Sequence, residues 1–156
     1  MFVTFEGLDG SGKTTQVDLL RAHLVEQGRD VVTAREPGGT WLGERVRELV
    51  LHGDDVSPWA EAALFAAARA ELVSRVIRPA LDSGSDVVCD RYVDSSLAYQ
   101  GIARGLGVEA VLDLNAPAID RLLPHRTFVL LVDPAESERR RQGAPDRIES
   151  ENDDFS

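Results

Sequence analysis

The chain has 156 residues, 43% of them hydrophobic, and its 27 acidic and 17 basic residues give a formal net charge of -10. This length suits one domain with a core of ordinary size. The negative charge excludes a general attraction to nucleic acid polymers or anionic membranes, so anions must be bound locally. The sequence has no basic leader and no apolar run of membrane-spanning length, and its single Cys89 cannot form an internal disulfide. We therefore expect a cytoplasmic protein.

Apolar runs alternate with helical patterns along the chain, which predicts an α/β fold with a mainly parallel sheet. Residues 2–6 (FVTFE) have the composition of a short buried strand. Residues 13–27 have the apolar spacing of a helix, and Gly28 would end it. Residues 30–34 (DVVTA) predict a second strand.

Further along the chain, Ser57-Pro58 is typical of a helix start, and the alanine-rich pattern predicts a helix to about Leu81. Asp133 to Glu136 (DPAE) predicts the start of another helix. Two further buried strands are expected at 86–90 (DVVCD) and 127–133 (TFVLLVD).

A glycine-rich segment, GLDGSGKT, lies between the first predicted strand and the first predicted helix. It fits the phosphate-binding pattern G-x-x-x-x-G-K-[ST] in the strand-to-helix context that this pattern requires. The glycines allow successive backbone amides and the helix N-terminus to converge on phosphate oxygens. The alternative is a plain glycine turn with a solvated lysine. The residues predicted to bind ATP are Gly7, Leu8, Asp9, Gly10, Ser11, Gly12, Lys13 and Thr14.

Lys13 is the only lysine in a chain that has sixteen arginines. A position that keeps lysine needs a compact ammonium on a flexible stem, which suits one phosphate reached at close quarters. We predict that Lys13 bridges the β- and γ-phosphates and that the Thr14 hydroxyl binds Mg²⁺. Because no other lysine exists, the Asn-Lys-x-Asp motif of guanine-binding switches is excluded. Hydrolases and kinases remain open.

The segment CDRYVDSSLAYQG (89–101) follows the third predicted strand, at the sheet edge where open α/β sheets bind ligands. Asp90 would face the Mg²⁺ and act on it through water, as a catalytic residue beside Lys13. Arg91 would bind a phosphate with its planar fork. For these two residues alone, a local ion pair is an equally good interpretation.

Five segments, in this order, resemble motifs of the bacterial thymidylate kinases, a family of P-loop nucleoside monophosphate kinases. The resemblance covers nearly the whole chain and implies a P-loop NTPase-type three-layer fold, a parallel sheet flanked by helices. It also implies transfer of the γ-phosphoryl group of MgATP to dTMP, with Mg²⁺ as cofactor, and a homodimer. The alternatives are another nucleoside or nucleoside monophosphate kinase, and a nucleotide-binding protein without turnover. The segments are FEGLDGSGKTTQ (5–16), REPGGT (35–40), LFAAAR (64–69), DRYVDSSLAYQG (90–101) and DRIE (146–149).

The resemblance also implies a pocket for the thymine base. Phe65 would stack on the ring, and Arg69, four residues further along the same helix face, would bond its edge. Simple core packing is the alternative for Phe65. Ser96 stands where some family members have an amide side chain facing the base, so the resemblance implies a contact from its hydroxyl instead.

The sugar and phosphate of dTMP would be held by other residues, again by resemblance. Arg91 would bind the monophosphate, and Asp9 would lie near the sugar. The Tyr99 ring would crowd the 2′ position and so disfavour ribose. Arg35, from the REPGGT loop, is a weaker candidate for the monophosphate.

Residues 138–149 (ERRRQGAPDRIE) resemble the mobile lid of these kinases. Gly10 and Ser11 are small and carry no charge, so a cation for the transferring phosphoryl group would come from the lid. Arg140, Arg141 and Arg147 are the catalytic candidates, and a solvated helix end is the alternative. Family members usually continue with a further helix and strand, which this sequence would lack; we expect residues 1–156 to form one kinase domain.

Overall fold

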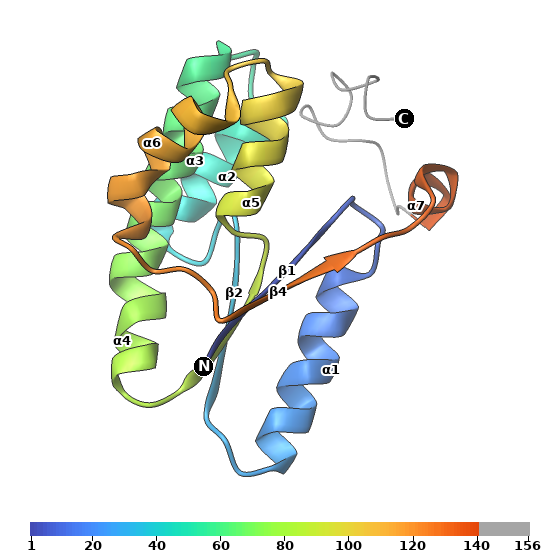
Figure 1. Cartoon of the computed structure of the whole chain (residues 1–156), viewed down its shortest axis with the longest axis vertical. Coiled ribbons are helices and arrows are strands. Elements are labelled where there is room, and N and C mark those ends of the chain that lie inside the picture. Colours follow the sequence, from blue (N-terminus) through green and yellow to red (C-terminus); the bar gives the residue numbers. More distant parts are fainter. Residues whose placement is uncertain (141–156) are drawn as a thin grey trace.

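The computed structural model describes residues 1–140 and shows a parallel sheet with helices on both faces (Figure 1). The four strands lie in the order β2-β3-β1-β4, and every pairing is parallel. The α/β fold expected from the sequence is thus confirmed. In chain order the elements are β1 (Phe2–Gly7), α1 (Lys13–Glu26), β2 (Val31–Arg35), α2 (Trp41–His52), α3 (Pro58–Leu72), η1 (Val73–Ile77), α4 (Arg78–Asp82), β3 (Asp86–Asp90), α5 (Val93–Ser96), η2 (Leu97–Ala103), α6 (Val108–Ile119), β4 (Arg126–Leu130) and α7 (Pro134–Arg140).

Two apolar clusters hold the layers together, one on each face of the sheet. Helix α1 covers one face, where Val17 and Leu24 pack against Val3, Phe5 and Val88 of the strands. Figure 1 shows the helices from α2 to α6 grouped away from α1, beyond the sheet. Because side chains alternate along a strand, neighbouring residues of β1 and β3 serve opposite clusters.

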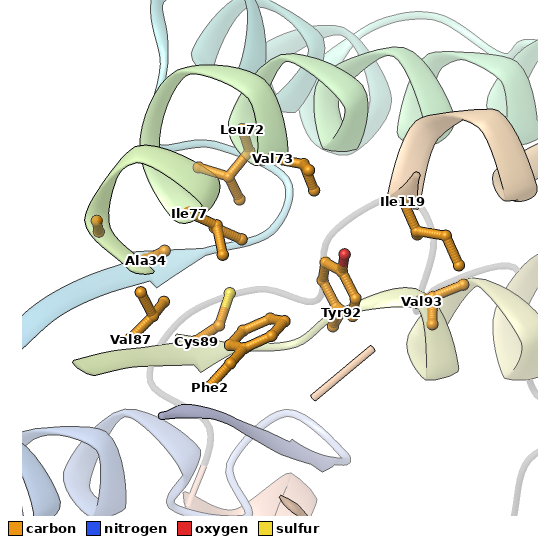
Figure 2. Close-up of a cluster of buried hydrophobic side chains, with 11 residues drawn as sticks. Phe2, Ala34, Leu72, Val73, Ile77, Val87, Cys89, Tyr92, Val93 and Ile119 are labelled. Atoms are coloured by element: carbon orange, nitrogen blue, oxygen red, sulfur yellow. The ribbon is translucent and has the colours of Figure 1, made fainter. Parts of the chain in front are cut away.

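The larger cluster lies between the sheet and the helices opposite α1 (Figure 2). The ring of Phe2 meets that of Tyr92 edge-on, with 5.1 Å between their centroids. Leu72, at the end of α3, and Ile77, in η1, pack in the same cluster as the strand residues and are fully buried. Cys89 lies in this cluster as a free, buried thiol. This packing fixes the carboxyl ends of β1 and β3, where the candidate site begins.

The expected strands and helices form with small shifts, but three points differ from the sequence analysis. The helix expected to run to about Leu81 changes at Val73 into η1, a segment of wider π-type turns, and then into α4. Helices α2 and α6 were not predicted. The strand expected to be buried at 127–133 is the shorter β4, and Phe128 and Val129 are half-exposed. The expectation of burial was wrong because, within the described residues, β4 is an edge strand that pairs with β1 alone.

Within residues 1–140, no helix is both long enough and apolar enough to cross a membrane.

Candidate active site

The glycine-rich loop connects the end of β1 to the start of α1, as the sequence predicts. Gly7 has a φ of +141°, and a Cβ there would lie 2.6 Å from the carbonyl oxygen of Leu130 on the neighbouring strand. Gly12 has a φ of 93° and directly precedes α1. Glycine is needed at both positions, because a side chain would be strained at each and would clash at Gly7. The loop therefore brings backbone amides and a helix N-terminus to one place.

The Lys13 side chain is folded into this loop and is only 5% exposed. Its Nζ donates to the carbonyl oxygens of Gly7 at 3.0 Å and Leu8 at 2.8 Å, and to Oδ1 of Asp9 at 3.3 Å. Burial, and then the nearby Arg91 charge, lower the pKa of Lys13, while the carboxylates of Asp9 and Asp90 oppose the shift. The solvated lysine that the sequence left open is thus not what the structure contains.

Thr14 and Asp90 meet at the base of the loop. The Thr14 hydroxyl donates to Oδ2 of Asp90 at 2.8 Å. Asp90 ends β3, which pairs with β1 so that Asp90 stands opposite Phe5. The two groups are hard oxygen donors of the kind that Mg²⁺ prefers, and Mg²⁺ is usually held by one or two carboxylates together with substrate phosphates. Among residues 1–140, no group of three or more His, Cys, Asp or Glu side chains could hold a metal.

Arg91 lies beside the loop and connects it to α5. It forms an ion pair with Oδ1 of Asp9, and its Nη1 donates to Oγ of Ser95 at 3.0 Å. Its guanidinium stands over the Tyr99 ring, 5.3 Å from the centroid. The backbone of Arg91 has a φ of 69°, which is uncommon for a residue with a side chain. Such a conformation persists where the surroundings fix it, and here they aim a cation at the loop.

Glu6, on β1, binds the segment from Arg91 to Ser95 that leads from β3 into α5. Its carboxylate accepts from the Tyr92 backbone N–H at 2.8 Å and from the Ser95 hydroxyl at 2.6 Å. Burial raises the pKa of Glu6, and the hydrogen bonds from Ser95 and Tyr92 oppose this shift. The sequence analysis did not identify Glu6, and its only signal was an acidic residue inside an apolar strand.

A pocket opens next to this turn, between α3 and the segment formed by α5 and η2. Phe65 supplies a flat apolar wall from α3, and Tyr99 supplies a second ring. The pocket thus contains most of the residues that the resemblance assigned to dTMP. Its lining residues are Asp9, Glu36, Pro37, Arg47, Leu51, Phe65, Arg91, Ser95, Ser96, Tyr99 and Gln100.

Arg69 lies behind the pocket wall instead of among its lining residues. It is 1% exposed, and its donors are directed at Oε2 of Glu36 (2.8 Å from Nε), at Asn115 and at Oγ of Ser96 (3.1 Å). Burial raises the pKa of Glu36, and the Arg69 charge opposes this rise. Because Arg69 donates to the Ser96 oxygen, the hydroxyl hydrogen of Ser96 can point into the pocket. The contact between Arg69 and a base edge stays a prediction.

A second cavity lies over the glycine-rich loop. It is lined by loop residues from Asp9 to Thr14 and by Arg35, Asp90 and Arg140. Asp9, Glu36, Arg47 and Arg91 line both this cavity and the pocket beside Phe65. A phosphate donor over the loop and a flat acceptor in the pocket would therefore approach one another at this shared wall.

Three further residues of the site were not identified from the sequence: Glu36, Arg47 and Gln100. Arg47, on α2, reaches both cavities and donates to the Pro37 carbonyl oxygen at 3.0 Å. Helix α2 was not predicted, so nothing in the sequence placed Arg47 near the loop. The weaker candidate Arg35 pairs with Glu44 at 2.9 Å and is half-exposed.

The base of the expected lid is visible in α7. Ser137 is buried, and its hydroxyl donates to the carbonyl oxygen of Asp9, which ties α7 to the loop. Arg140 pairs with Glu136, 2.5 Å between Nε and Oε1, and lines the cavity over the loop. Arg141 and Arg147 lie outside the described residues.

Comparison with known proteins gives one consistent result. The family model described as thymidylate kinase matches residues 5–156. A thymidylate kinase of Bifidobacterium longum is 55% identical over 160 residues, which cover 99% of this chain and 78% of that protein. One of Caldanaerobacter subterraneus is 48% identical, covering 99% of this chain and 75% of that protein. The crystal structure of thymidylate kinase from Ehrlichia chaffeensis superposes with a TM-score of 0.81 at 39% identity, covering 99% and 85% of the two chains.

Proposed function

Because this chain belongs to the thymidylate kinase family, we propose that it transfers the γ-phosphoryl group of MgATP to dTMP and forms dTDP. One observation carries the proposal: the cavity over the phosphate-binding loop and the pocket beside Phe65 share Asp9, Glu36, Arg47 and Arg91. A kinase needs two nucleotide sites that meet at the transferred group, whereas a nucleotide-binding protein or hydrolase needs only the first.

On the donor side, the loop would hold the ATP phosphates through its backbone amides, with Lys13 between the β- and γ-phosphates. The Lys13 ammonium already points inward, so a bound polyphosphate would replace the carbonyl and Asp9 oxygens that it now contacts. Thr14 and Asp90 would hold Mg²⁺, Asp90 through water, and this ion would neutralise charge on the phosphates.

On the acceptor side, Phe65 offers a face on which a pyrimidine ring can stack, and Ser96 and Gln100 offer polar groups for its edge. Arg91 can reach the monophosphate, because it stands on the shared wall and its partner Asp9 belongs to the loop. Tyr99 lies under Arg91, in a position suited to crowding a 2′-hydroxyl.

Catalysis in this arrangement would rest on positioning and charge, since phosphoryl transfer needs little covalent help from the protein. Arg91 and Glu6 fix the acceptor side relative to the loop. Lys13, with the arginines of the expected lid, would stabilise the charge that spreads over the oxygens of the transferring group. The loop itself supplies no second cation at Gly10 or Ser11.

A coupled assay of ADP release with a panel of monophosphates tests the proposal. We expect dTMP to be used in preference to dCMP, dGMP and UMP. Equal use of UMP and dTMP would contradict the assignment. ADP release without any acceptor would favour a hydrolase, and nucleotide binding without ADP release would favour the non-catalytic alternative.

We also propose a homodimer and, as the sequence suggests, a cytoplasmic location. Large apolar side chains are exposed on α3, η2 and α6: Trp59 is 50% exposed, Ile102 66% and Leu112 41%. Helices α3 and α6 pack against one another and η2 contacts α6, so the elements that carry these side chains are neighbours. A second copy of the chain would cover them. Light scattering at micromolar concentration should give twice the monomer mass, and Leu112→Arg should reduce it.

A further inference from the structure

Helix α3 and the segment α5–η2 face one another across the pocket, and two residues on α3 each bond one residue of that segment. Glu61, Phe65 and Arg69 are four residues apart on α3 and so share a face. Arg69 donates to Ser96, and Glu61 accepts from Gln100. Two polar residues of the pocket wall, Ser96 and Gln100, are therefore each held from behind by a charged residue of α3, and Phe65 lies between these two charged residues on the helix.

Of the two charged residues, Glu61 is the more unusual, because it is a carboxylate that is fully buried, with 0% exposure. A buried charge is costly unless it is paired and hydrogen-bonded. Glu61 meets this condition: Arg104 donates to Oε1 at 3.2 Å and to Oε2 at 2.8 Å, and Nε2 of Gln100 donates to Oε1 at 3.0 Å. None of the phosphate chemistry described above uses Glu61.

The contact with Glu61 determines how the Gln100 amide is turned. A carboxylate accepts hydrogen bonds and cannot donate them, so only the amide nitrogen of Gln100 can face Glu61. The amide oxygen lies on the other branch of the same plane and so faces away from Glu61. Gln100 is 1% exposed, and it lines the pocket beside Phe65.

We propose that Glu61 is a positioning residue that fixes Gln100 with its amide oxygen toward the pocket, so that the pocket accepts the N–H of a pyrimidine imide and disfavours cytosine. This rests on the proposed function, since it assumes a pyrimidine monophosphate in the pocket. Thymine carries a hydrogen at N3 and can donate to the Gln100 oxygen. Cytosine presents a lone pair there, and two acceptors facing one another in a buried site leave both unpaired.

The test compares the dissociation constants of dTMP and dCMP by calorimetry, which requires no turnover. In Glu61→Gln, the new amide can donate as well as accept, so Gln100 can turn its nitrogen toward the pocket. We expect the preference for dTMP over dCMP to fall by about 10-fold or more, on the scale of one mispaired polar group in a binding site. Glu71→Gln is the matched control on α3, because Glu71 pairs with Arg75 at the surface, and it should leave the preference unchanged.

A double-mutant cycle separates positioning from a general loss of structure. Gln100→Ala should also reduce the preference, and adding Glu61→Gln to it should change the preference by less than about twofold. If Glu61→Gln lowers the preference equally with and without Gln100, Glu61 does not act through Gln100 and the inference is overturned. Glu61→Gln with an unchanged preference overturns it as well.

Three further outcomes can be told apart. If Glu61→Gln does not fold because Arg104 loses its partner, Glu61→Gln/Arg104→Met removes the buried charge entirely and should show the same loss of preference. If the unmodified protein binds neither nucleotide, the proposed function fails, and the inference with it. If the unmodified protein prefers dTMP but the variants keep that preference, only the inference fails.

Discussion

At the scale of the residue, Lys13 tests whether the site needs an ammonium or only a positive charge. Its Nζ makes three contacts within the loop and is buried among backbone carbonyls. A guanidinium is larger and planar and cannot take this position without moving the loop. Both Lys13→Ala and Lys13→Arg should therefore lower kcat/KM by about 100-fold or more, the scale for removing one charged donor in a preorganised site. Steady-state kinetics measure this, with circular dichroism as the control for folding, and near-normal activity of Lys13→Arg would contradict the argument.

Glu6 gives a prediction for stability against pH. Burial raises the pKa of Glu6 above its ordinary value of 4.5. A group whose pKa is raised by folding contributes stability that is complete below its unfolded pKa and is lost as pH rises through its folded pKa. The Tm of the unmodified protein relative to Glu6→Gln should therefore be highest below about pH 4.5 and fall as pH rises above that value.

Thermal melts of both proteins at matched pH values measure this difference, and the comparison cancels the titration of all other groups. A difference that stays flat would show that Glu6 ionises as easily in the folded protein as in the unfolded one, and a difference that grows with rising pH would show that it ionises more easily when folded; either result contradicts the prediction.

Individual residues also show what the sequence could and could not predict about the site. The loop and Asp90 were predictable, because their backbone geometry and their place at strand ends follow from local pattern. Glu36 and Arg47 were not, because their roles depend on partners 33 and 10 residues away, Arg69 and the Pro37 carbonyl. Arg69 was expected in the pocket by resemblance, and only the structure reveals the Glu36 carboxylate that draws it behind Ser96.

At the scale of the element, the accuracy of prediction followed the strength of the local signal. The central strands β1 and β3 have continuous apolar runs and were predicted within one or two residues. Helix α6 carries Pro117 in its interior, and a proline at such a position predicts the end of a helix, so α6 was not predicted. The burial of β4 could not be predicted, since the same composition suits a central strand or an edge strand.

Helix α2 begins with an N-cap residue whose contribution to stability can be measured. Thr40 is its N-cap, and the side-chain oxygen accepts from the Gly43 N–H at 2.9 Å. Thr40→Ala should reduce the free energy of unfolding by about 1 kcal/mol, the usual value of such a cap. Urea denaturation measures the change, and Thr40→Ser, which keeps the hydroxyl, should retain most of the stability. An equal loss in both variants would mean that the methyl group of Thr40, and not the cap, matters.

At the scale of the whole molecule, positive charge has to be concentrated at the site although the chain as a whole is acidic. The chain carries a net charge of -10, yet it must bring together two anionic nucleotides. Cations are therefore concentrated at the shared wall, where Arg47 and Arg91 line both cavities, and Lys13 lies in the loop. Asp9 forms an ion pair with each of Arg91 and Lys13, which holds both cations beside the loop. The rest of the surface can stay acidic because its long-range repulsion of anionic nucleotides is screened beyond about 10 Å at ordinary salt.

The arginines of the expected lid would complete this arrangement, and they give the last prediction. Arg140 lines the cavity over the loop, is half-exposed and pairs with Glu136. Ser137 ties the helix that carries Arg140 to Asp9, so a change at the loop can reach the lid directly. If Arg140, Arg141 and Arg147 act only when the lid closes, they stabilise the transition state more than the bound ground state.

Replacing the three arginines singly by alanine should therefore reveal at least one position where kcat falls by about 100-fold or more, while dTMP binding changes little. The measurement is steady-state kinetics beside calorimetric binding of dTMP, with Arg75→Ala, a surface arginine of η1 paired with Glu71, as the control. Lower dTMP affinity at unchanged kcat would instead assign these arginines to ground-state binding. Unchanged kcat in all three variants would mean that the arginine run is a solvated helix end, since the γ-phosphoryl charge would then be met by Lys13 and Mg²⁺ alone.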